Sequence, residues 1–103
     1  MITSTLSFMV APGKNMEANE YFHTVVRQVK KITGTDLRVL VQLGGPMGHY
    51  VLSSTFDTLS AWEQVRTKLQ ADVPFQKLVA EAGKDGLFIP GSVTTALWQQ
   101  QQQ

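Results

Sequence analysis

The chain contains no cysteine and only two histidines among its 103 residues. Without cysteine there can be no disulfide, no thiol nucleophile and no thiolate-held metal, so stability must come from the apolar core. The two histidines do not stand four residues apart, the spacing at which a helix presents two imidazoles to one metal ion. The sequence therefore predicts neither a metal site nor a bound cofactor.

An excess of charge of either sign is also missing. Nine Lys and Arg residues against eight Asp and Glu residues give a formal net charge of +1, and the basic residues are scattered. A nucleic-acid binder usually carries a clustered basic footprint, so no nucleic-acid partner is expected. No run approaches the roughly 18 consecutive apolar residues of a membrane span, and the first residues do not resemble a signal peptide. We therefore expect a cytoplasmic protein without a membrane partner.

The length leaves room for one domain, because most domains have about 100–150 residues. We place this single domain at residues 1–98. The glutamines at 99–103 have no apolar partner in the sequence and are predicted to form a frayed tail.

The period of the apolar residues alternates between two, typical of strands, and 3.6, typical of helices. The predicted order is β-α-β-β-α-β, the ferredoxin-like arrangement of an α+β domain with a four-stranded antiparallel sheet and its helices on one face. The expected elements are a strand at 2–10, a helix from an N-cap at Asn15 to a stop at Gly34, strands at 36–43 and 49–56, a second helix from 59 that is interrupted at 72–75 and stops at Gly83, and a last strand at 92–98.

The second and third strands can be placed in register through their apolar residues. Pairing Leu43 with Tyr50 separates an apolar face from a more polar one, whereas a one-residue slip would mix the two sets. Under this register the helix side receives Tyr50, Leu52, Ser54 and Phe56, and the opposite side receives Arg38, Gln42, His49, Ser53 and Thr55. The expected core consists of Phe22, Val26, Phe56 and Trp62.

Two helices can cover only one face of a four-stranded sheet. The other face carries both polar and apolar side chains, among them Thr5, Leu40, Val51 and Trp98. Such a mixed face suits a sheet that packs on the same sheet of a second copy and leaves a partly polar space between the two. The sequence therefore predicts a homodimer.

The uncovered face also supplies the candidate ligand-binding residues, which are Arg38, Gln42, His49, Ser53 and Trp98. An arginine in the middle of a strand requires an anion when it is buried; a ligand carboxylate, an acidic residue of a partner subunit and simple exposure all remain open for Arg38. His49 is the candidate catalytic residue, because a neutral imidazole can take a proton from an acid or a phenol. A solvated strand end is the alternative for His49.

Two segments resemble a known family. Residues 48–63, with Phe56 ending a strand and Trp62 in the next helix, resemble the strand-to-helix passage of the dimeric α+β barrel superfamily. The Asp-Val-Pro-Phe-Gln segment at 72–76 resembles the break found in its NIPSNAP-like members. This resemblance implies a sheet-to-sheet homodimer, the dimeric α/β barrel, with a small-molecule cavity in each subunit.

The resemblance does not select one activity, because the superfamily includes cofactor-free monooxygenases, haem-degrading enzymes and binding proteins. Its antibiotic-biosynthesis-monooxygenase-like branch tends to use a His in the second helix and an Asn on the first strand, and residues 59–69 and 2–10 contain neither. Two hypotheses follow. In one, the protein binds a small apolar or aromatic acid, with or without cofactor-free turnover, in a cavity between helices and sheet or between sheets. In the other, it is a dimerisation or structural module with no catalytic activity.

Overall fold

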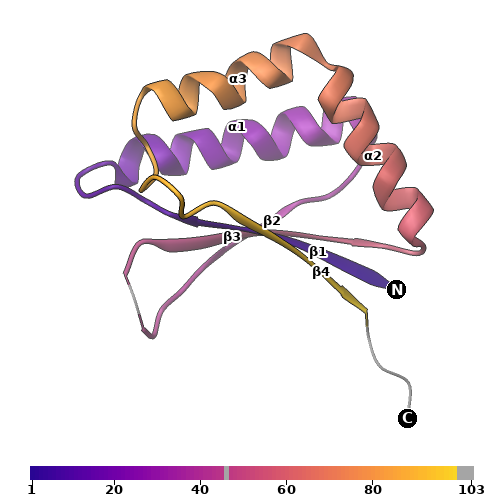
Figure 1. Cartoon of the computed structure of the whole chain (residues 1–103), viewed down its shortest axis with the longest axis horizontal. Coiled ribbons are helices and arrows are strands. Elements are labelled where there is room, and N and C mark those ends of the chain that lie inside the picture. Colours follow the sequence, from indigo (N-terminus) through magenta and orange to yellow (C-terminus); the bar gives the residue numbers. More distant parts are fainter. Residues whose placement is uncertain (46, 100–103) are drawn as a thin grey trace.

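The computed structural model describes residues 1–45 and 47–99. Seven elements follow one another along the chain (Figure 1): β1 (Ile2–Met9), α1 (Asn15–Thr33), β2 (Arg38–Val41), β3 (His49–Phe56), α2 (Leu59–Ala71), α3 (Val73–Lys84) and β4 (Thr94–Gln99). This order confirms the predicted one, with the second helix divided into α2 and α3.

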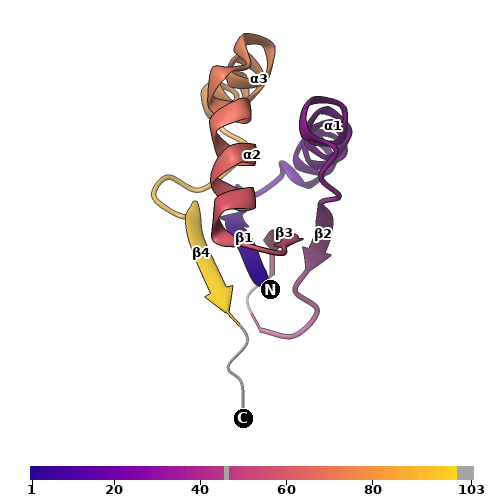
Figure 2. The same cartoon turned by 90° about the vertical axis from the view of Figure 1, so that its right-hand side faces the viewer.

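The four strands form one antiparallel sheet in the order β2-β3-β1-β4. All three helices lie on the same side of this sheet, with α1 on one half and the α2–α3 pair on the other (Figure 2). The architecture is therefore the predicted α+β ferredoxin-like fold, and no helix of the described residues lies on the opposite face of the sheet. We call this opposite face the open face.

The register between β2 and β3 differs from the prediction by two residues. Val41 pairs with Tyr50, the position that the sequence assigned to Leu43. Because side chains alternate with a period of two, a shift of two residues leaves every side chain on its predicted face. The apolar pattern therefore determined the faces correctly but could not determine the register.

The helix ends depend on specific caps. α1 begins at Asn15 with Lys14 as its N-cap and without a side-chain cap, so the prediction that Asn15 caps this helix is wrong. Its end at Gly34 is confirmed, because this residue has a φ of 77°, a left-handed conformation that glycine adopts without strain. The break at Asp72 is capped: its carboxylate accepts a hydrogen bond of 2.9 Å from the Phe75 amide, and Pro74 stands in the first turn of α3.

The core lies between α1 and the sheet. Phe22 is 0% exposed, and its ring centroid lies 5.3 Å from that of Phe8 and 5.1 Å from that of Tyr50. The buried cluster consists of Phe8, Val10, Ala18, Phe22, Val25, Val29 and Leu52. In contrast, α2 has no buried residue and α3 has one, Ala82. The α2–α3 pair thus covers its half of the sheet without filling the space beneath it.

Trp62 and Gln99 correct two further expectations. Trp62 is partly buried and stands outside the buried cluster, so it does not fill the core as predicted. Gln99 pairs with Ile2, so β4 includes the first residue that the sequence assigned to a frayed tail; residues 100–103 lie outside the described ranges. No helix within 1–45 or 47–99 has both the length and the apolar character needed to cross a membrane.

Candidate functional site

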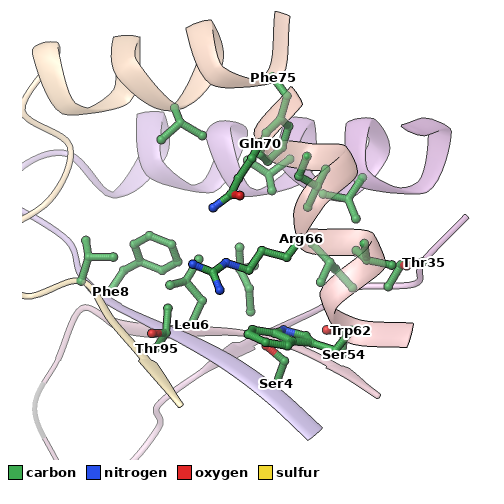
Figure 3. Close-up of a pocket in the computed structure, with 18 of the residues that line it drawn as sticks. Ser4, Leu6, Phe8, Thr35, Ser54, Trp62, Arg66, Gln70, Phe75 and Thr95 are labelled. Atoms are coloured by element: carbon green, nitrogen blue, oxygen red, sulfur yellow. The ribbon is translucent and has the colours of Figure 1, made fainter. Parts of the chain in front are cut away.

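A cavity of about 830 Å³ lies between the three helices and the sheet (Figure 3). Its size is in the range of small-molecule sites, roughly 300–1,000 Å³. Most of its wall is apolar. The sheet and the loop before β4 contribute Leu6, Phe8, Leu52, Phe56, Phe88, Val93 and Leu97; the helices contribute Val25, Val29, Trp62, Val65, Leu69, Phe75 and Val79.

One face of α2 forms the wall opposite the sheet. The Thr58 hydroxyl accepts a hydrogen bond of 3.1 Å from the Ala61 amide and thereby fixes the start of this helix. From there Trp62, Arg66 and Gln70 follow at intervals of four, which places them one above another on the same side of the helix. All three line the cavity.

Arg66 is the only charged residue among the described residues that line this cavity. Its guanidinium carbon lies 5.5 Å from the centre of the Trp62 ring, within the range of a cation–π contact. No carboxylate of the described residues forms an ion pair with Arg66. The one ion pair among the described residues joins Lys30 to Asp36 at 2.9 Å, and neither of these two residues lines the cavity. The guanidinium is therefore free to bind an anion.

Gln70 stands one turn beyond Arg66. Figure 3 shows the Gln70 amide and the Arg66 guanidinium both extending into the space between α2 and the sheet. An amide can donate or accept, so Gln70 can support an anion that Arg66 holds or contact a neutral polar group beside it. Both residues are exposed, so a ligand could reach them from solvent.

The opposite walls contribute neutral donors and acceptors. Ser4, Ser54 and Thr95 line the cavity from the sheet, and Tyr21 lines it from α1. Burial raises the pKa of Tyr21 above its ordinary value of 10, so its phenol is protonated at neutral pH and can donate a hydrogen bond. Its ring lies edge-on to Phe88 at 5.6 Å.

The five residues predicted from the sequence lie elsewhere. Arg38 pairs with Ser53 across β2 and β3, and Gln42 and His49 are joined by a hydrogen bond of 2.5 Å between Oε1 and Nδ1. Trp98 donates to the Thr5 hydroxyl at 3.0 Å. All five lie on the open face, as the alternation of side chains along the strands predicted, and none of them lines the cavity. Their role in ligand binding stays a prediction.

The sequence reasoning missed Arg66, Gln70 and the sheet serines as site residues. A usable signal was present, because Trp62, Arg66 and Gln70 recur at the spacing of four that defines one helical stripe. Two of its three members are polar, however, and a stripe with polar members is also typical of the solvated side of a helix. Chemically, the arrangement can bind an anion at Arg66 and stack an aromatic ring on Trp62. Residues 1–45 and 47–99 contain no cluster of three or more metal-ligating side chains.

A scan against models of protein families finds no match, and a search of curated proteins finds none either. Solved structures match over almost the whole chain. A NIPSNAP domain protein from Burkholderia xenovorans is 16% identical, with a TM-score of 0.79 and coverage of 98% of this chain and 95% of its own. A NIPSNAP family protein from Agrobacterium tumefaciens is 18% identical, with a TM-score of 0.77 and coverage of 95% and 90%.

An antibiotic biosynthesis monooxygenase also matches, with 14% identity, a TM-score of 0.73 and coverage of 99% of this chain and 100% of its own. At such identities a structural match establishes the fold and not the activity. The chain thus has the ferredoxin-like fold found in NIPSNAP and antibiotic biosynthesis monooxygenase structures, the branch that its sequence resembles.

Proposed function

We propose that the protein binds a small apolar or aromatic acid in the cavity between the helices and the sheet. The observation that carries this proposal is the charge on the cavity wall: among the described residues Arg66 is the only charged one that lines this mostly apolar cavity, and none of their carboxylates pairs with it. An anion held there would gain charge-assisted hydrogen bonds, which are stronger than neutral ones.

The remaining wall residues fit the rest of such a ligand. Trp62 offers a flat aromatic surface below the guanidinium, so an aromatic acid could stack on it while its carboxylate reaches Arg66. The apolar wall beyond, which includes Phe8, Phe75 and Phe88, would cover further rings or an alkyl chain. The proposal concerns binding only. It does not carry over the activity of the monooxygenase that has a similar fold.

Isothermal titration calorimetry with 2-naphthoic acid tests the proposal, with Arg66→Gln and Arg38→Gln as a matched pair. Loss of a charge-assisted hydrogen bond is worth about 1.5–3 kcal/mol, so Arg66→Gln should weaken binding roughly 10- to 100-fold. Arg38→Gln should leave the affinity unchanged, because this residue lies on the other face of the sheet.

The opposite pattern, with Arg38→Gln weakening binding and Arg66→Gln having no effect, would move the site to the open face. Should neither this acid nor longer-chain and polycyclic acids bind the parent protein, the structural-module hypothesis would replace ligand binding.

We further propose that the open face mediates a homodimer. Leu40 is 50% exposed and Trp98 is 59% exposed there, and none of the helices in the described part of the chain covers either residue. A specific interface needs about 800 Å² from each partner, so the dimer would bury Leu40 and Trp98 together with their neighbours on this face.

Light scattering can test the dimer with two variants of similar exposure. Leu40→Asp would bury an unpaired charge between the two sheets and should yield monomers. Leu59, which is 48% exposed at the start of α2, provides the control: Leu59→Asp should leave the dimer intact. A parent protein that is monomeric across micromolar concentrations would contradict the proposal.

A further inference from the structure

Two serines interrupt the apolar floor of the cavity at a single point. On the helix side of β3, Ser54 stands between Leu52 and Phe56 and is 8% exposed, a burial that serine seldom has. Ser4 of β1 pairs with it directly in the antiparallel register. Both residues line the cavity, so two hydroxyl groups lie side by side in an otherwise apolar part of the sheet.

Neither hydroxyl takes part in a hydrogen bond within the described ranges of the chain. In the same ranges no fully enclosed side-chain polar atom lacks a partner, so these two oxygens face the open space of the cavity. A polar group placed in an apolar wall is unfavourable unless something satisfies it. The pair therefore points to a partner that enters the cavity.

The position of the serines relative to Arg66 restricts that partner. Figure 3 shows Ser4 and Ser54 on the sheet and Arg66 on α2 above it, with the Trp62 ring between the two levels. A ligand that stacks on Trp62 and reaches the guanidinium with one end would bring another part of its ring system toward the serines. The cavity thus has a charged recognition point on one wall and a neutral one on the other.

We infer that the ligand carries, besides its acid group, a second neutral polar group that Ser4 and Ser54 recognise; this inference rests on the proposed acid-binding function. A ligand hydroxyl suits the pair, because it can donate to one serine oxygen and accept from the other. A second carboxylate does not suit it, since within 1–45 and 47–99 Arg66 is the only cation that lines the cavity, and a second buried charge would be unpaired. The ligand class is a hydroxylated aromatic monoacid.

Calorimetry with a matched ligand pair tests this inference. 2-Naphthoic acid and 6-hydroxy-2-naphthoic acid differ only by a hydroxyl at the end of the rings away from the carboxylate. The parent protein should bind the hydroxylated acid roughly three- to tenfold more tightly, the effect of one net hydrogen bond. Ser4→Ala with Ser54→Ala should abolish this preference, so that the two acids bind the variant with equal affinity.

Two control variants separate the possible results. Ser7→Ala makes the same change on the open face of β1 and should retain the preference, whereas Arg66→Gln should weaken both acids by the same factor. If the parent protein binds both acids equally, or if the serine variants retain the preference, the inference is overturned while acid binding stands. If neither acid binds, acid binding itself fails and the serine inference fails with it.

Discussion

Replacing Ser54 by Val should stabilise the unliganded protein. The substitution removes a hydroxyl that has no hydrogen-bond partner in the described chain and adds apolar contact with Leu52 and Phe56 along the same side of β3. A fully buried hydroxyl without a partner is unfavourable by about 1–3 kcal/mol. The Ser54 oxygen is not fully enclosed, so water can satisfy it in part, and we expect a gain at the lower end of this range, about 1 kcal/mol. Val also favours strands, and the cavity leaves room for its methyl groups.

Urea unfolding at one fixed protein concentration measures this effect. With a slope of about 2 kcal/mol per molar urea, the midpoint should rise by about 0.5 M without a change in slope. Ser7→Val on the open face is the control, with a change within about 0.5 kcal/mol. A loss of more than about 1 kcal/mol in Ser54→Val would refute the reasoning, because it would mean that the hydroxyl is satisfied or that the space above it is filled.

Three further predictions concern the rest of the fold. Phe22→Ala should lower the free energy of unfolding, measured in urea, by about 3–5 kcal/mol, because this ring is fully buried. Trp62→Ala should lower it by about half as much, because Trp62 is only partly buried. Equal losses would contradict the conclusion that the space beside Trp62 is not filled by other side chains. Asp72→Ala should lower thermal stability by about 1 kcal/mol through loss of the α3 cap, while Asp72→Asn should retain most of it. Burial raises the pKa of Tyr21 above 10. The contribution of this phenol to stability is therefore complete below pH 10 and is lost as the pH rises further. Above pH 10 the urea midpoint of Tyr21→Phe should fall less steeply than that of the parent protein.

The order of elements and the face of each strand residue could be predicted because both depend on local periodicity. Alternation along β3 alone placed Ser53 and Ser54 on opposite faces, as the structure has them. The register of β2 against β3 could not be predicted, because pairing Leu43 or Val41 with Tyr50 gives the same alternation. The N-cap of α1 was predicted one residue too late. A capping residue precedes the first helical residue, and in the structure Asn15 is itself that first residue, with Lys14 before it.

The stripe of Trp62, Arg66 and Gln70 is visible in the same periodicity, but the cavity beside it could not be predicted from that periodicity. Periodicity indicates which residues face the sheet, but it does not indicate whether the space between the layers is filled. Trp62 faces the sheet as predicted, and only the packing of α2 decides whether its ring meets other side chains or an empty volume. A charged residue next to an apolar stripe, such as Arg66, usually packs its stem against the protein and keeps its charged group in solvent, so its charge alone does not indicate a site.

α1 contributes to the buried cluster and α2 does not, and this difference affects how the protein can change during evolution. α1 and the sheet hold the buried cluster, whereas α2 buries no residue and supplies Trp62, Arg66 and Gln70 to the cavity. Under the proposed acid-binding function, substitutions that reshape ligand preference would therefore fall largely where they disturb stability least. Most mutations destabilise, and a protein tolerates only those that keep it above the threshold for folding. A lineage with this fold could therefore exchange one ligand for another through changes on α2 while the α1 half of the molecule remains the same.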